Sequence, residues 1–189
     1  MLLSDLVLAV IDRHGKRGCR GRTRLQKEVY FLREALEVQV IYQPHYYGPY
    51  SAELAATVQS LVAEGLVGEE QELTPGEGPF ERVTYTYRLT PAPNGQTLVD
   101  AWKTHAHQES AQFNAAFDKL ALSSQSVQEL AVASKIHHVV SASNKPVPRS
   151  ELNESVRQLG WEVSEDEEQK AVNFLLDHGL VKEQEQSSR

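Results

Sequence analysis

The stretch from Tyr46 to Val67 constrains the fold more than any other part of this chain. Gly48 and Pro49 end an extended run, and Ser51 is a residue type that caps a helix by accepting a hydrogen bond from a first-turn amide. Apolar residues then recur along one helical stripe, at Leu54, Ala55, Val58, Leu61, Val62 and Leu66. Gly65 readily adopts the left-handed conformation that ends a helix. The pattern predicts an amphipathic helix between Ser51 and Gly65, with an extended segment after it.

A β-hairpin is predicted directly after this helix. Two extended runs, residues 66–73 and 82–89, flank a turn-forming segment at residues 74–79, and the second run alternates apolar with polar side chains. A helix that ends in Glu-Gly-Leu-Val and leads into a hairpin is typical of the third helix and wing of a winged-helix domain. We therefore expect a winged-helix-like domain over residues 1–93.

The other predicted elements are mostly helical. Apolar stripes at helical spacing occupy residues 3–11, 25–36, 96–107, 113–120, 127–140, 152–159 and 164–178. Residues 37–47, rich in β-branched and aromatic side chains, predict a short strand. We expect a helical C-terminal domain over residues 94–189, whose last helix ends in Gly-Leu-Val like the helix before the hairpin and suggests a second helix-turn-helix-like half. The predicted fold class is mainly α with a small β-hairpin (α+β).

Composition is that of an ordinary soluble protein. The 189 residues are 40% hydrophobic and 24% charged, and the formal net charge of −7 opposes indiscriminate binding to nucleic acid. A single cysteine excludes an internal disulfide framework. The apolar run at residues 2–11 is too short to span a bilayer, and Asp5 interrupts it, so it is a poor signal peptide. We expect a cytoplasmic protein that does not bind a membrane.

A basic segment follows the first predicted helix. Six of the twelve residues 13–24 are Arg or Lys and three are Gly, a composition that would let a flexible loop follow phosphates. The candidate nucleic-acid-binding residues are Arg13, Lys16, Arg17, Arg20, Arg22, Arg24 and Lys27. Alternatively, the first cations complement a helix C-terminus and the others are solvated. Cys19 lies among these cations, so we expect an exposed thiol with a lowered pKa, but no base partner for catalysis.

Two further sets of side chains are candidates for binding a protein partner. They are Tyr46, Tyr47 and Tyr50 around the Gly-Pro turn, and Glu69, Glu70 and Glu72 of the hairpin. The tyrosines either form an aromatic platform or pack the junction of two helices, and we favour the packing interpretation. The hairpin carboxylates would repel phosphates and attract a basic surface. The helix before the hairpin carries no Arg or Lys, so helix and hairpin are poorly suited to reading DNA.

No catalytic or cofactor motif is recognisable in the sequence. It contains no Gly-rich phosphate loop and no nucleophile elbow. The pairs His105/His107 and His137/His138 have spacings unsuited to a metal ion. The acidic run at residues 165–168 follows Ser164 in a capping-box pattern, which favours a helix start over a catalytic carboxylate cluster. We therefore expect no enzyme activity, no cofactor and no metal site.

Three segments carry a resemblance to known proteins: Arg24–Leu32, His45–Leu54 and Glu64–Val67. They read Arg-Leu-Gln-Lys-Glu-Val-Tyr-Phe-Leu, His-Tyr-Tyr-Gly-Pro-Tyr-Ser-Ala-Glu-Leu and Glu-Gly-Leu-Val. The combination resembles the bacterial and archaeal YwgA-like family and, more distantly, the SocA-like (Panacea) antitoxin domains, over residues 1 to about 90. The first resemblance implies a helical, winged-helix-like fold. The second implies a non-enzymatic protein that binds and neutralises or delivers another protein.

Together these patterns favour a non-enzymatic winged-helix regulatory or interaction module, antitoxin-like in that it binds a protein partner. The alternative is a transcriptional regulator, acting as a homodimer, that binds duplex DNA with the basic segment Arg13–Lys27. The two interpretations differ in whether this segment meets phosphates.

Overall fold

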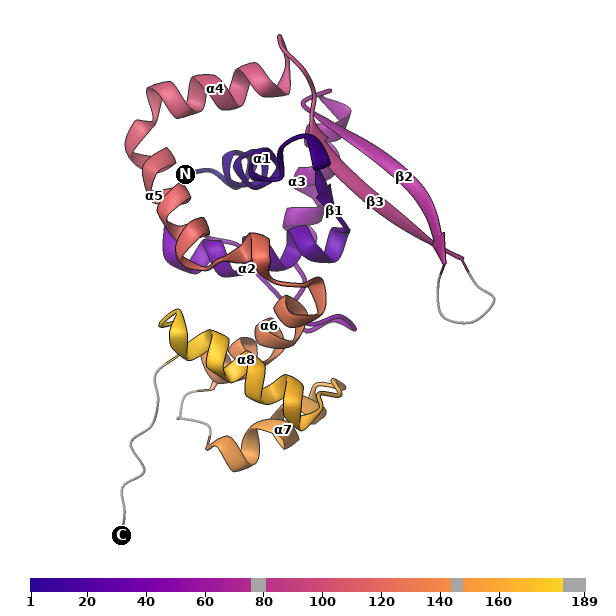
Figure 1. Ribbon diagram of the computed structural model, residues 1–189, viewed down its shortest axis with the longest axis vertical. Coiled ribbons are helices and arrows are strands. Elements are labelled where there is room, and N and C mark those ends of the chain that lie inside the picture. Colours follow the sequence, from indigo (N-terminus) through magenta and orange to yellow (C-terminus); the bar gives the residue numbers. More distant parts are fainter. Residues whose placement is uncertain (76–80, 144–147, 182–189) are drawn as a thin grey trace. The chain divides into compact units, whose positions relative to one another are not determined.

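The computed structural model describes residues 1–75, 81–143 and 148–181 (Figure 1). It is mainly helical with a small three-stranded antiparallel sheet, which confirms the predicted α+β class. The chain forms two compact units. The first comprises Met1–Tyr42 and Ser51–Ser123, and the second comprises Gln43–Tyr50 and the chain from Ser124 onward. Within the described ranges, no helix is both long and apolar enough to cross a bilayer.

The first unit is built around the helix α1. Its elements are α1 (Leu3–Arg13), a 3₁₀ turn η1 (Gly15–Arg17), β1 (Cys19–Arg20), α2 (Arg22–Leu36), α3 (Ala52–Ala63), β2 (Val67–Pro75), β3 (Glu81–Leu89), α4 (Gly95–His105), α5 (His107–Lys119) and a second 3₁₀ turn η2 (Leu122–Ser124). Residues 6–11 of α1 are all buried, because α2, α3, α4 and β3 contact the helix on several sides (Figure 1). A helix that is apolar all round requires such enclosure.

The helix predicted after the Gly-Pro turn is confirmed as α3. The Ser51 hydroxyl accepts a hydrogen bond from the Leu54 amide at 3.1 Å, and Gly65 has a φ of 70° just beyond the helix. Leu61 is buried as the stripe predicts, whereas Leu66 is only half-buried. Gln26 of α2 fixes the start of α3, because its side-chain amide donates to the Ser51 carbonyl at 2.9 Å and accepts from the Ser51 amide at 3.0 Å.

The hairpin is confirmed, but the sheet has a third strand that the sequence pattern missed. Strands β2 and β3 pair in register from Val67–Leu89 to Pro75–Glu81, and residues 76–80 of the predicted turn lie outside the described residues. Strand β1 pairs with the other edge of β3, giving the order β1-β3-β2. The basic segment was predicted to be a flexible loop, so this prediction is wrong at β1. Gly18 permits the pairing, since a Cβ there would lie 2.8 Å from the Tyr87 carbonyl oxygen.

The strand predicted over residues 37–47 is not formed. Glu37 ends α2 in the left-handed conformation, and regular pairing is limited to one isolated bridge between Gln43 and Tyr50 within the described residues. Tyr42 is buried and donates its hydroxyl hydrogen to the Gln26 carbonyl at 3.1 Å. Val38 and Val40 are buried like Tyr42, whereas Ile41 is exposed, so the β-branched residues of this segment do not form a sheet ladder.

The predicted domain boundary at residues 93–94 differs from the division between the two units. The Thr90 hydroxyl donates to the Gly65 carbonyl at 2.8 Å and accepts from the Gly95 amide at 3.0 Å. A Cβ on Gly95 would lie 2.0 Å from the Leu66 carbonyl oxygen, so the two backbones touch. Residues 90–95, which contain Pro91 and Pro93, are thus a tightly packed connection inside the first unit, and α4 and α5 belong to that unit.

The second unit contains α6 (Val127–Ala142), α7 (Arg149–Gln158) and α8 (Glu165–Asp177), together with the Gln43–Tyr50 turn. Ser164 and Glu167 form the predicted capping box at the start of α8. The core of this unit includes Leu130, Ile136, Val156, Trp161 and Leu175. Residues 144–147, between α6 and α7, and residues 182–189 lie outside the described residues.

Candidate functional site

Residues of the basic segment pair with the hairpin carboxylates in the first unit. Arg20 of β1 donates to the carboxylate of Glu72 at 3.0 Å, and a guanidinium nitrogen of Arg22 lies 3.9 Å from a carboxylate oxygen of Glu69. Arg88 of β3 forms an ion pair with Glu70. The hairpin carboxylates therefore face cations of β1, β3 and the start of α2, which lowers the negative potential that a basic partner would meet.

The seven candidate cations do not form one exposed surface. Arg13 pairs with Asp118 and lies over the ring of Phe117, 4.7 Å from its centroid. Lys27 is only 2% exposed. Lys16 and Arg17 of η1 are exposed, and their backbone carbonyls accept hydrogen bonds from Arg88 at 3.1 and 3.3 Å.

Two other candidate cations are held by neighbouring side chains. Arg24 pairs with the buried Glu28 at 2.9 Å. Arg22 lies over the ring of Tyr85, 3.5 Å from its centroid, and donates to the hydroxyl of Tyr87 at 3.3 Å. Burial lowers the pKa of Arg22, but this hydrogen bond and nearby groups outweigh it and raise the pKa overall.

The aromatic turn at residues 45–50 exposes its tyrosines. Tyr46 is 77% exposed, Tyr47 61% and Tyr50 37%. The packing interpretation is therefore wrong for Tyr46 and Tyr47, whose rings contact each other edge-to-face with centroids 4.8 Å apart. Backbone bonds close the turn, with Gly48 donating to the His45 carbonyl at 2.9 Å and Gln43 and Tyr50 exchanging two bonds.

Trp161 fixes the same turn within the second unit. Its indole nitrogen donates to the His45 carbonyl at 2.7 Å, and the side chain is buried. Gly48 has a φ of 95°, which favours glycine, and Pro49 beside it is buried. The tyrosines are thus carried by a backbone that is hydrogen-bonded on both sides of the turn.

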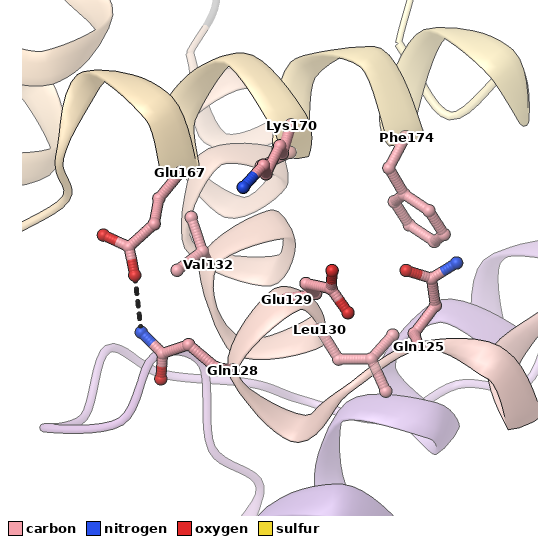
Figure 2. Close-up of a pocket in the computed structure, with 9 residues that line it drawn as sticks. Gln125, Gln128, Glu129, Leu130, Val132, Glu167, Lys170 and Phe174 are labelled. Carbon is pink, nitrogen blue, oxygen red and sulfur yellow. Dashed lines mark hydrogen bonds between the residues drawn. The ribbon is translucent and has the colours of Figure 1, made fainter.

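A small cavity lies between α6 and α8 of the second unit. Figure 2 shows Glu167 and Phe174 of α8 facing Gln128 and Leu130 of α6, with Gln128 donating to Glu167 at 2.9 Å. Its volume is about 70 Å³, well below the roughly 300 Å³ at which small-molecule sites begin. We therefore interpret it as a packing gap between two helices.

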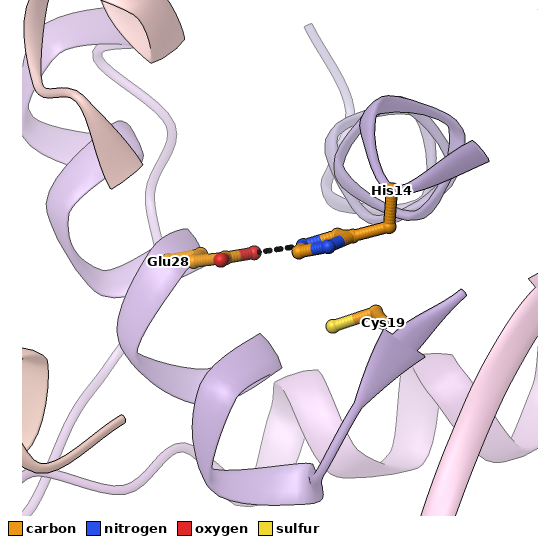
Figure 3. Close-up of side chains that lie close together, drawn as sticks. All are labelled: His14, Cys19 and Glu28. Carbon is orange, nitrogen blue, oxygen red and sulfur yellow. Dashed lines mark hydrogen bonds and ion pairs between the residues drawn. The ribbon is translucent and has the colours of Figure 1, made fainter. Parts of the chain in front are cut away.

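A buried polar cluster joins three elements of the first unit. His14 follows α1, Cys19 lies on β1 and Glu28 lies on α2, and one ligand-type atom from each lies within 4.8 Å of the others. The Nε2 atom of His14 is 2.8 Å from Oε2 of Glu28 (Figure 3). Arg24 donates to Oε1 of Glu28 at 2.9 Å. Figure 3 shows the Cys19 sulfur directed toward the His14–Glu28 pair.

The environment of Cys19 contradicts the sequence-based expectation. The thiol is fully buried, and burial raises its pKa well above the ordinary value. The negative charge of Glu28 raises the pKa further, and Arg24 opposes this with a smaller effect. The neighbouring cations in the sequence point elsewhere because β1 alternates its side chains between the two faces of the sheet, so Cys19 is buried and Arg20 exposed.

Sequence reasoning missed this cluster because its residues have no zinc-motif spacing. His14, Cys19 and Glu28 are separated by four and eight residues, and a bend through Gly15 and Gly18 brings the first two together. Both glycines have positive φ. These two glycines were the one feature of the sequence that could have indicated a tight bend bringing His14 close to Cys19.

Comparisons with known proteins add no functional information. The chain matches no protein-family model and no curated protein. The resemblances to the YwgA-like and SocA-like families therefore stay predictions, and the proposals below rest on the geometry of the chain itself.

Proposed function

We propose that this protein is a non-enzymatic interaction module that binds a protein partner through the aromatic turn of residues 45–50. The observation that carries the proposal is the exposure of Tyr46 and Tyr47 on a backbone fixed by hydrogen bonds. Large aromatic side chains are enriched in protein interfaces because they bury much area at low conformational cost. A turn held before binding loses less entropy when the partner arrives.

The residues beside the turn are also fixed. Tyr42 and Ser51, which flank the Gln43–Tyr50 segment in the chain, both hydrogen bond to Gln26 of α2. The residues on both sides of the Gln43–Tyr50 segment are thus hydrogen-bonded to the same helix. A regulatory or antitoxin-like role in the cytoplasm is one setting for such a module.

The alternative, duplex DNA binding by the basic segment as a homodimer, has weaker support. Arg20 and Arg22 face hairpin carboxylates, and Lys27 is buried, so few cations are left to meet phosphates. Lys16 and Arg17 are exposed, but two cations give a much weaker electrostatic contribution than the six to ten phosphate contacts of typical DNA-binding proteins.

A site-specific crosslinking experiment tests the proposal. A photoreactive phenylalanine analogue is placed at Tyr47, and in a control at Leu98 of α4, which is 45% exposed. The proposal expects a protein crosslinked from position 47 and not from position 98, followed by direct binding of that protein in purified form. Tyr46→Ala and Tyr47→Ala should each weaken the purified complex by about tenfold or more. Unchanged affinity in both variants would contradict the proposal.

A further inference from the structure

We propose that His14, Cys19 and Glu28 form a binding site for one divalent ion of the zinc class. The ligand atoms are His14 Nε2, Cys19 Sγ and Glu28 Oε2, which come from three separate elements and converge within 4.8 Å. Imidazole nitrogen, thiolate sulfur and carboxylate oxygen are the three donor types that zinc accepts. The inference goes beyond the proposed binding of a protein partner and involves the other unit of the chain.

The geometry requires only a small adjustment. Bonds of about 2.0–2.3 Å in a tetrahedral site place neighbouring ligand atoms about 3.3–3.6 Å apart. The 2.8 Å between His14 Nε2 and Glu28 Oε2 must therefore lengthen by about half an ångström, while the sulfur must move inward from at most 4.8 Å. Side-chain rotations supply movements of this size, since none of the three ligand atoms belongs to the backbone.

Arg24 prepares Glu28 for this role. It donates to Oε1 at 2.9 Å and so leaves Oε2 directed toward His14. Carboxylates that bind metals commonly have their second oxygen hydrogen-bonded in this way, which fixes the orientation of the ligand. Arg24 would thus be a positioning residue and not a ligand.

Binding of the ion requires two of the ligand atoms to be free of protons. Zn²⁺ forms bonds to sulfur, nitrogen and oxygen, the thiol proton of Cys19 leaves to solvent, and any proton on His14 Nε2 leaves that atom so that its lone pair binds the ion. Two anionic ligands, Glu28 and the new thiolate, then face the dication and Arg24. With the ion bound to a neutral imidazole, the net charge of the cluster is +1.

The fourth coordination position is accessible from the side of His14. The His14 side chain is 15% exposed to solvent, whereas the side chain of Glu28 is 0% exposed and Cys19 is fully buried. Three protein ligands with one open position describe a site that takes a water or an external ligand. Within the described residues, this is the one group of three or more His, Cys, Asp and Glu side chains with such convergence.

Cobalt(II) titration of the full-length protein tests the proposal. We expect a one-to-one complex with visible bands of a tetrahedral ion and a near-ultraviolet band from thiolate-to-cobalt charge transfer, displaced by Zn²⁺. Cys19→Ala should abolish the charge-transfer band, and His14→Gln should weaken binding about 10- to 100-fold. His105→Gln, at an exposed histidine, should leave both unchanged.

A second measurement avoids dependence on variants that fold poorly. Zn²⁺ should raise the Tm of the wild-type protein, since an ion that binds the folded state stabilises it by mass action. It should also slow alkylation of Cys19 in mild denaturant. Absence of the charge-transfer band in the wild type, or an equal band in Cys19→Ala, would show that the cluster is a buried ion pair and overturn the proposal.

Discussion

The indole nitrogen of Trp161 donates a hydrogen bond to the backbone carbonyl of His45 at 2.7 Å, joining residues that are 116 positions apart in the chain. This bond ties the aromatic turn to the core of the second unit. Residues 43–50 belong to that unit, although the residues on either side belong to the first. The order of the turn is therefore set by a residue far along the chain.

Replacing Trp161 with Phe should loosen the turn. The variant loses a buried hydrogen bond worth about 1 kcal/mol and leaves the His45 carbonyl without this donor. Amide hydrogen exchange in residues 43–50 should become faster. Trp102→Phe is the matched control, because its buried indole nitrogen has no acceptor among the described residues. Equal acceleration in both variants would contradict this assignment.

Leu61→Asp should unfold the first unit. Leu61 is 4% exposed on α3, so the variant places a charge in the core and should lose about 3 kcal/mol or more. Ala56→Asp, at an exposed position of the same helix, should lose less than about 1 kcal/mol. Urea denaturation followed by circular dichroism measures both. If Leu61→Asp unfolds at the wild-type midpoint, α3 does not contribute to the core.

The hairpin carboxylates should suppress binding to DNA. Wild-type protein should bind random duplexes weakly at physiological salt. Changing Glu69, Glu70 and Glu72 to Gln should tighten binding and steepen the log–log salt slope by about 0.9 for each new phosphate contact.

The control for this experiment changes the net charge equally at Glu151, Glu154 and Glu162, which are exposed residues of the second unit. Fluorescence anisotropy compares the two triple variants over a range of salt concentrations. A similar gain in DNA affinity in both triple variants would mean that the affinity depends on net charge and not on the release of Arg20 and Arg22 from their carboxylate partners.

Gly95→Ala should destabilise the connection between β3 and α4. The new Cβ would lie 2.0 Å from the Leu66 carbonyl oxygen and 3.0 Å from its carbon, so one backbone must move. We expect a loss of about 1–3 kcal/mol in thermal unfolding. In Gly68→Ala the nearest atom is 3.9 Å away, and little change is expected. If Gly95→Ala leaves the thermal stability unchanged, the connection is loosely packed, as a linker between two domains would be.

Alkaline pH should destabilise the first unit partly through Tyr42. Burial raises the pKa of Tyr42 above its ordinary value, with a smaller opposing effect from Arg33. The unfolded chain therefore releases the Tyr42 proton at a lower pH than the folded chain. This contribution to stability is complete below about pH 10 and falls as the pH rises further.

The Tyr42→Phe variant tests this pH dependence. Its unfolding free energy should decline less steeply above about pH 10 than that of the wild type. Leu32→Val, which removes a buried methylene without a titrating group, should lower stability at every pH and keep the wild-type slope. Parallel declines in wild type and Tyr42→Phe would show that other groups govern alkaline unfolding.

Local patterns in the sequence determined the elements whose stabilising contacts are close in the chain. The cap at Ser51 reaches Leu54, Gly65 lies two residues beyond the end of α3, and Ser164 and Glu167 of the capping box are three positions apart. The hairpin was predictable because alternation and turn chemistry specify an antiparallel neighbour. These features depend on backbone geometry and helical or strand periodicity alone.

The tertiary structure decided which charged and aromatic residues are available for binding. Arg20 and Glu72 are 52 residues apart, and the pairing of both β1 and β2 with β3 brings them to 3.0 Å. The same strand buries Cys19 beside Glu28, which reversed the expected direction of its pKa. Tyr46 and Tyr47 are exposed, and Trp161, far along the chain, donates a hydrogen bond to the turn that carries them. Electrostatic and burial energies depend on distances through space, which periodicity in a single sequence does not specify.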